Sequence, residues 1–392
     1  MNSSWFCDWV TVSQQHGPDV PDFVGGRVLK VTGLNVARRS EEGVAILGDA
    51  IDVDYCTGTF ETVRGSWDTS LRVRCVGGRV EVSGNPSHWD RLDNLFGLSV
   101  DDCMAVINQL LQRLGLPVFT PFESLGCSQG RGSLTWHKRG AEFSRLDVTT
   151  NVLAGMGRVR DFNKWAASQK LYRSAPDDPG RYRFNTVYLS ESVEYMGVKL
   201  YDKALAIEER TGSEFVKRLA RAVKAGRITA EEARALQEEG AGYLERLAEW
   251  LASHGVCRYE VRFGRKKLEE GDCRGWLPGV TGERVVGMAS ENFERLLSRA
   301  VVVNGDAEEL LTPAELSVYR AWRRGRVGVE CAKSASTFYR VRSSILAKTG
   351  HDVNRPCGLV ADGDVRPSYF RVRSLVPSAL PSWYQQPVRL AA

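Results

Sequence analysis

Three short segments of the 392-residue chain alternate between polar and apolar residues, and this alternation most constrains the fold. They are FSRLDVTTN (143–151), VKLYDK (198–203) and CRYEVRF (257–263). Because successive side chains of a strand point to opposite faces, each segment predicts a strand with one polar and one apolar side. If the strands are neighbours in one antiparallel sheet, helices cover the apolar side, and the polar sides form a common floor.

The predicted floor holds charged residues and one tyrosine. Its members are Arg145, Asp147, Lys199, Tyr201, Lys203, Arg258, Glu260 and Arg262. Carboxylate oxygens suit Mg²⁺ or Mn²⁺, so Asp147 and Glu260 are the expected ligands of an ion that polarises a phosphate oxygen. The set fits phosphodiester cleavage by Tyr201, with nearby lysines and the metal favouring its phenolate. The alternative is an ordinary solvated face in which the carboxylates pair with arginines.

The rest of the chain predicts an α+β fold with antiparallel sheets, helices packed on one face, and a small helical C-terminal domain. Residues 1–100 read mainly as strands and turns, and 205–255 are helical and charged. We expect an N-terminal α+β subdomain at 1–130, a catalytic subdomain at 131–303, and a basic helical domain with a Pro-rich tail at 304–392.

Composition narrows the class of protein. No apolar run approaches the roughly 18 residues of a membrane span, and no signal peptide is recognisable. The nine cysteines are scattered without CxxC spacing, which predicts reduced thiols in a cytoplasm rather than disulfides or a zinc site. No phosphate-binding loop of the GKS or GKT kind occurs, so we expect no ATPase, and any DNA unwinding would come from a partner helicase.

The net charge of +5 lies entirely in residues 304–392, where Lys and Arg outnumber Asp and Glu by 13 to 8. The segment LTPAELSVYRAWRRGRVGVECAKSASTFYRVRSSILAKTGHDV reads as helix, turn and helix, with Arg340, Arg342 and Lys348 on the second helix. Such a unit can place its second helix in a DNA groove while basic side chains hold phosphates. The alternative is a helical domain that docks on the body or on a second copy. The tail LVPSALPSWYQQPVRLAA is expected to be a loosely ordered arm.

The three alternating segments, in this order, resemble those of rolling-circle replication initiators, most of all the gene II-type initiators of filamentous phages. Small staphylococcal plasmids have initiators of similar arrangement. FCDWVTVSQQH, EVSGNPSHWDRLDNLFG and STFYRVRSSILAKTGHDV also resemble the phage branch, so the likeness covers most of the chain. The resemblance implies that Tyr201 is the nicking residue, that Asp147 and Glu260 lie near the metal, and that Lys199 and Lys203 are basic positions around the tyrosine.

The third metal ligand and the identity of the nucleophile cannot simply be carried over from the family. Many rolling-circle nickases bind their ion through a His-hydrophobe-His triplet, which this chain lacks. His137, just before the Asp147 strand, is a candidate third ligand, and the alternative is an ordinary polar residue. Tyr195 is an alternative nucleophile. The other interpretation is that both Tyr188 and Tyr195 are packing residues of the strands.

The resemblance implies a metal-dependent, site-specific DNA nickase that also rejoins strands and works in the host bacterial cytoplasm. Its partners would be double- and single-stranded origin DNA, a host helicase and a host DNA polymerase. Arg145, Arg258 and Arg262 are expected to bind DNA together with the C-terminal basic residues. One rival is a DNA-binding regulator without catalysis. Another is a tyrosine recombinase or type IB topoisomerase, which the acidic pair Asp147 and Glu260 disfavours.

Overall fold

The structure is a computed structural model of the 392-residue chain. It describes residues 4–17, 20, 28–32, 52–56, 70–89, 91–130, 133–168, 185–224, 226, 228–298, 308, 310–349, 351–354 and 372–384. None of the helices in these ranges is long and apolar enough to cross a membrane.

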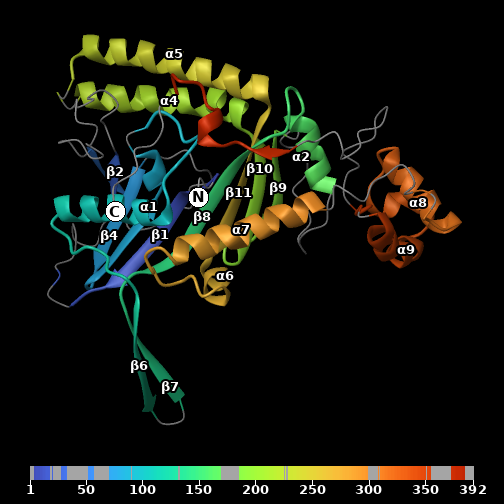
Figure 1. The fold of residues 1–392 in the computed structure, drawn as a ribbon, viewed down its shortest axis with the longest axis horizontal. Coiled ribbons are helices and arrows are strands. Elements are labelled where there is room, and N and C mark those ends of the chain that lie inside the picture. The colour runs from blue at the N-terminus through green and yellow to red at the C-terminus, as the bar shows by residue number, and fades with distance from the viewer. Residues whose placement is uncertain are drawn as a thin grey trace.

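A large antiparallel sheet forms the centre of the molecule (Figure 1). Its strand order is β3-β2-β4-β5-β1-β8-β11-β10-β9, and β12 pairs with β8. The strands are β1 (Trp5–Gln15), β2 (Val28–Thr32), β3 (Asp52–Cys56), β4 (Ser70–Val76), β5 (Arg79–Gly84), β8 (Glu142–Leu153), β9 (Thr186–Glu191), β10 (Met196–Asp202), β11 (Val256–Gly264) and β12 (Arg373–Ser374). A separate hairpin, β6 (Glu123–Gly130) and β7 (Ser133–Arg139), projects from the body.

The three alternating segments form β8, β11 and β10, and these strands are direct neighbours. Thr149 lies opposite Glu260, and Glu260 lies opposite Lys199, so the polar sides face the same way. The α+β class is confirmed. Strands from both sides of the predicted boundary at residue 130 share this one sheet, because β1 lies between β5 and β8.

Helices cover the apolar face of the sheet. They are α1 (Val100–Arg113), α2 (Val159–Ser168), α6 (Arg265–Glu270) and α7 (Thr281–Ser298). Val148, Val198 and Val261 of the three central strands belong to the same buried cluster as Met104 of α1 and Leu296 of α7. Burial of this apolar surface, about 25 cal/mol per Å², is the main force that holds the two layers together.

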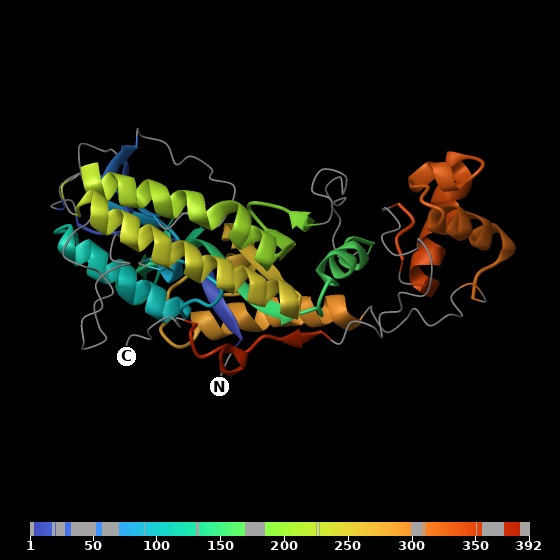
Figure 2. The same cartoon turned by 90° about the horizontal axis from the view of Figure 1, so that it is seen from above.

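A helical hairpin of α4 (Lys203–Lys224) and α5 (Ala230–His254) lies over part of the other face (Figure 2). Thr229 and Glu232 form a capping box at the start of α5. Leu247 and Leu251 of α5 pack with Phe6 of β1 in a second buried cluster. Helices therefore lie on the apolar face, as predicted. In addition, the hairpin of α4 and α5 covers part of the polar face.

The basic C-terminal segment forms a helix-turn-helix unit with its own core. Its helices are α8 (Pro313–Arg323) and α9 (Ala335–Thr349), joined through the short 3₁₀ helix η4 (Gly328–Cys331). Trp322, Phe338 and Ile345 are the centre of this core. The unit therefore has the two-helix arrangement that the sequence predicts.

The expectation of a loose Pro-rich tail is wrong for residues 372–384, which we call the C-terminal arm. Arg373 and Ser374 pair with Leu153 and Val152 of β8, and a 3₁₀ helix, η6 (Pro377–Ala379), follows. Tyr384 is buried in the cluster beneath α5. The arm is ordered because its apolar side chains complete a core that the rest of the chain leaves open.

We predict opposite effects for two glycines of the α5 region. Gly255 ends α5 at φ +61, and an added Cβ would lie 1.8 Å from the carbonyl oxygen of Gly155. Gly255→Ala should lower the free energy of unfolding by more than about 2 kcal/mol, through left-handed strain plus this clash. Gly242→Ala, where nothing lies within 4 Å, should raise it by about 0.5–1 kcal/mol. Urea denaturation measures both, and equal effects would contradict the packing around Gly255.

Candidate active site

Three cross-strand rows of residues make the polar floor. From one end of the strands to the other, they are Asn151–Arg258–Tyr201, Thr149–Glu260–Lys199 and Asp147–Arg262–Gly197. Directly opposed residues in an antiparallel pair have Cβ atoms about 4.5–5.5 Å apart. The structure thus brings Asp147 and Glu260, which are distant in the chain, to the pair Lys199 and Tyr201.

Asp147 is fully buried and held by two arginines. Nε of Arg145 donates to its Oδ1 at 2.8 Å, and Nε of Arg262 lies 3.7 Å from its Oδ2. Burial alone would raise the pKa of Asp147, but Arg145 and Arg262 outweigh it and lower that pKa. Asp147 is therefore a charged carboxylate at neutral pH.

Glu260 pairs with Lys199 at 2.8 Å rather than with Arg258. Burial raises the pKa of Glu260, the charges of Asp8 and Asp147 raise it further, and Lys199 opposes this shift. Burial acts to lower the pKa of Lys199, but Glu260 outweighs it and raises that pKa. The negative charges of Asp8 and Asp147 thus act on Glu260, and Lys199 is the main cation that offsets them there.

Tyr201 is only 4% exposed, and Nζ of Lys199 lies 5.2 Å from its ring centre. Burial raises the pKa of Tyr201 to about 12; Glu260 adds to the rise, whereas Arg258 and Lys199 counteract it. The phenolate that the sequence predicts depends on a metal as well as on the lysines; without the ion, burial outweighs the neighbouring cations. The phenol keeps its proton at neutral pH and must lose it before or during any attack.

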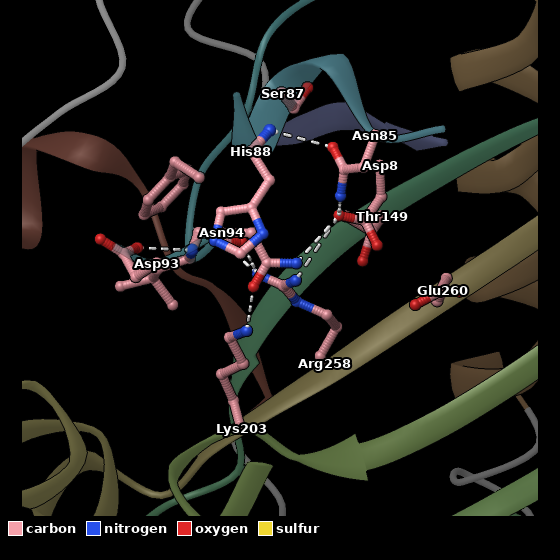
Figure 3. Close-up of polar contacts among 12 residues, drawn as sticks. Asp8, Asn85, Ser87, His88, Asp93, Asn94, Thr149, Lys203, Arg258 and Glu260 are labelled. Carbon is pink, nitrogen blue, oxygen red and sulfur yellow. Dashed lines mark hydrogen bonds and ion pairs between the residues drawn. The ribbon is translucent and has the colours of Figure 1, made fainter. Parts of the chain in front are cut away.

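Lys203 does not lie beside Tyr201 on the strand, because β10 ends at Asp202 and Lys203 begins α4. It is fully buried, and its Nζ donates to Oδ1 of Asn94 at 2.5 Å (Figure 3). Burial, followed by the charge of Arg258, lowers its pKa well below the usual value. Lys203 therefore belongs to the buried polar network between the floor and the segment that carries Asn94, rather than to the surface around the tyrosine.

Arg258 is also fully buried, so it is not placed to contact DNA in this structure. Its Nε donates to Oδ1 of Asn151 at 2.9 Å, and its Nη2 donates to the carbonyls of Asn94 and Leu95. The side chain joins the sheet to the segment above it. By contrast, Arg145 and Arg262 keep about a fifth to a quarter of their side chains exposed and remain candidates for phosphate contact.

The sequence reasoning missed Asp8, which lies at a β-bulge of β1 between Cys7 and Trp9. Its Oδ1 accepts from Nδ2 of Asn85 at 3.0 Å and from Nδ2 of Asn94 at 3.1 Å (Figure 3). The stretches FCDWV and GNPSHWDRLDNLFG carry these residues, but strict alternation cannot reveal a bulge. Asp8 adds a third buried carboxylate to the floor.

The alternative nucleophile Tyr195 lies at the other end of β10. It is six residues from Tyr201, about 20 Å along a strand. Its hydroxyl donates to Glu270 at 2.6 Å. Tyr188, by contrast, lies directly opposite Lys199 on the edge strand β9. Of these two tyrosines, the structure brings Tyr188 and not Tyr195 to the floor.

The donor types of the floor suit a hard divalent cation, since Asp8, Asp147 and Glu260 offer carboxylate oxygens. In the described part of the chain, however, no three potential ligands already stand at metal-binding spacing. A metal at Glu260 would share that carboxylate with Lys199, whose Nζ lies 2.8 Å from Oε1, or would displace the lysine. The backbone of His137 lies in β7 of the projecting hairpin, and its side chain lies outside the described residues.

The basic residues predicted on α9 differ in their availability. Arg342 pairs with Asp352 through two hydrogen bonds of 3.0 Å, and Lys348 pairs with Glu315 at 2.7 Å. Arg340 and the aromatic ring of Tyr339 are exposed. The exposed side of α9 therefore offers Arg340 and Tyr339, whereas Arg342 and Lys348 hold the unit together.

Comparisons with known proteins agree with this organisation. No family model and no solved structure matches the chain significantly. The chain is 25% identical over 347 residues to a replication-associated protein of Escherichia phage If1, and the match covers 82% of this chain and 98% of that protein. The match confirms the resemblance of the chain to gene II-type replication initiators of filamentous phages.

Proposed function

We propose that the chain is a site-specific DNA nickase and strand transferase that starts and ends rolling-circle replication of a filamentous phage genome. The observation that carries this proposal is the meeting of Tyr201, Glu260, Lys199 and Asp147 on three adjacent strands. A nucleophile, carboxylates and cations on one floor are what phosphodiester transfer requires. The phage relative is named as a replication-associated protein, which agrees with this role.

In the proposed reaction, Oη of Tyr201 attacks a phosphorus atom of the viral plus strand at the origin. The new bond joins tyrosine to the 5′-phosphate, the P–O3′ bond breaks, and the 3′-oxygen takes up a proton to become a free hydroxyl. A host polymerase would extend that hydroxyl while a host helicase displaces the old strand. The reverse transfer closes the displaced strand into a circle and restores the phenol.

Glu260 and Asp147, with Asp8 as a third carboxylate, would hold Mg²⁺ or Mn²⁺. The ion supplies polarisation of a non-bridging phosphate oxygen and a positive charge that favours the phenolate. Lys199, released from Glu260, would then face the phosphate, and Arg145 and Arg262 would bind neighbouring phosphates. Because Tyr201 is 4% exposed, the substrate strand has to displace the groups that cover it.

The helix-turn-helix unit would supply duplex binding at the origin. Residues 311–354 contain eight Lys or Arg against three Asp or Glu, a charge that favours a polyanion. Arg340 and Tyr339, which are exposed on α9, would meet a groove of the duplex. The rival without catalysis, a DNA-binding regulator, would use the same surface.

We expect Tyr201→Phe to abolish both nicking of supercoiled origin DNA and the covalent protein–DNA band, because it removes the attacking oxygen and keeps the ring. Tyr195→Phe is the matched control and should keep both activities, since Tyr195 lies away from the floor. Wild-type protein with EDTA should be inactive. The attached DNA end should map to a 5′-phosphate.

Two results would contradict this reading. An adduct formed by Tyr201→Phe would move the nucleophile to another tyrosine. Origin binding without nicking by the wild type, in Mg²⁺ and in Mn²⁺, would favour the regulator.

The single-turnover nicking rate should rise with pH between about 6 and 8.5. With its pKa raised to about 12, Tyr201 is deprotonated in a fraction that grows tenfold per pH unit below that value. The logarithm of the rate measured at saturating Mn²⁺ should therefore have a slope near one at the acidic end, with Tyr195→Phe giving the same profile. A rate independent of pH would show that loss of the phenol proton does not limit the reaction.

Arg340→Ala and Arg342→Ala should separate DNA binding from stability. Arg340→Ala should weaken duplex origin binding by about 1–3 kcal/mol if the arginine contacts a base, with the melting temperature unchanged. Arg342→Ala should instead lower the melting temperature, because it removes the cation that pairs with the buried carboxylate of Asp352. Fluorescence anisotropy measures DNA binding, and thermal unfolding measures stability. Weaker binding by Arg342→Ala together with a lower melting temperature of Arg340→Ala would refute the proposal that Arg340 faces DNA.

A further inference from the structure

The C-terminal arm is attached to the strand that carries the site. Beyond the pairing of Arg373 and Ser374 with β8, the amide of Leu375 donates to the carbonyl of Asn151 at 2.8 Å, and Leu375 is buried. The side chain of Asn151 accepts from Arg258 on the floor. The arm therefore begins at the row of the sheet that contains Tyr201.

The arm ends at Tyr384, whose hydroxyl is fixed by three partners in residues 91–98, which we call the covering segment. It donates to Oδ1 of Asp93 at 3.0 Å and accepts from Nη2 of Arg91 at 3.0 Å and from the amide of Phe96 at 3.3 Å. The rings of Tyr384 and Phe96 meet edge to face at 6.4 Å. One hydroxyl is therefore hydrogen-bonded to three residues spread along the covering segment.

Asp93 joins the covering segment to a second element, α5. Besides Tyr384, it accepts from the hydroxyl of Tyr243 at 2.7 Å and from the amide of Leu95 at 2.7 Å. Burial would raise the pKa of Asp93, but Arg91 and these donors outweigh it and lower that pKa. A charged, buried carboxylate is thus held by donors from three parts of the chain, which fixes its position closely.

The covering segment in turn holds the polar network of the floor. Asn94 accepts from Lys203 and donates to Asp8, and the carbonyl of Leu95 accepts from Arg258 at 2.8 Å. Arg258 and Lys199 are the two cations that counteract the burial of the Tyr201 phenol. Displacement of the covering segment would therefore move the charges around the nucleophile.

We propose that Tyr384 is a positioning residue, through which the C-terminal arm holds the covering segment and thereby sets the geometry of the Tyr201 site. This inference rests on the proposed nicking function. It gives the last described residue of the chain a role in a reaction that takes place on the central sheet. Tyr384 itself touches neither the floor nor the reacting atoms.

The test compares Tyr384→Phe with Tyr319→Phe in the full-length protein. Each change removes one buried, hydrogen-bonded hydroxyl. The Tyr319 hydroxyl bonds His351 at 2.8 Å in the helix-turn-helix core, away from the floor. Single-turnover nicking of a single-stranded origin oligonucleotide gives a rate constant for the site and an amplitude for the fraction of active molecules. Hydrogen exchange at the Phe96 amide reports the covering segment without any need for activity.

We expect Tyr384→Phe to lower the rate constant by roughly tenfold to a hundredfold with an unchanged amplitude, because small displacements at a reacting centre have effects of this size. The Phe96 amide should exchange faster, and oligonucleotide affinity should stay the same. Tyr319→Phe should leave the rate constant and this amide unchanged. If Tyr384→Phe folds poorly, Leu375→Ala loosens the arm at β8 without substituting any residue of the covering segment, and it should give the same lower rate constant.

A merely structural role would lower the amplitude and the melting temperature and leave the rate constant alone, and that result would overturn the inference. An unchanged Phe96 amide in Tyr384→Phe would overturn it as well. If the wild-type protein forms no covalent product, the proposed nicking function itself fails, and the inference fails with it. An active wild type with an equally fast Tyr384→Phe refutes the positioning role alone.

Discussion

The site depends on one buried cation, the guanidinium of Arg258. An ionised group removed from water is strongly destabilising unless charges and hydrogen bonds replace its hydration. Here Asp8 lies 4.0 Å from its Nη1, and Asn151 and two backbone carbonyls accept its hydrogens. These acceptors come from a β-bulge, a neighbouring strand and the covering segment. Satisfying one charge therefore fixes three separate stretches of chain against each other, and this makes the polar face a rigid unit.

The same burial keeps the phenol of Tyr201, the proposed nucleophile, protonated in this structure. In water, a tyrosine beside lysine and arginine would lose its proton more readily, but in the closed site desolvation dominates and the phenol stays neutral. Glu260 and Lys199 meanwhile neutralise each other as an ion pair. In the proposed reaction, binding of a DNA strand and an ion would change the hydration and the partners of both groups. Reactivity would thereby be coupled to substrate binding.

Much of the fold and part of the site could be predicted from local sequence. The alternation at 143–151, 198–203 and 257–263 predicts three strands with matched polar faces, and capping boxes such as Thr229 with Glu232 mark helix starts. The position of Lys203 could not be found in this way, because the end of β10 depends on where α4 packs. Asp8 could not be predicted because it lies at a bulge. The covering segment could not be predicted because its contacts join residues 150 or more apart, such as Asp93 and Tyr243. Long-range polar contacts of this kind leave no periodic pattern, since each residue is placed by a distant partner.

The return of the chain to β8 makes the helix-turn-helix unit an insertion within the sheet domain rather than a terminal appendage. Its entry lies after Ser298 at the end of α7, and its exit lies before Arg373. The twelve residues between Ser298 and Leu311 span at most about 40 Å when fully extended. A DNA segment bound by the unit, as proposed, would therefore be held near the sheet domain by two chain connections, which would raise its effective concentration at the floor. The distance along DNA between a gripped sequence and the scissile phosphate is then limited by the length of the protein chain itself.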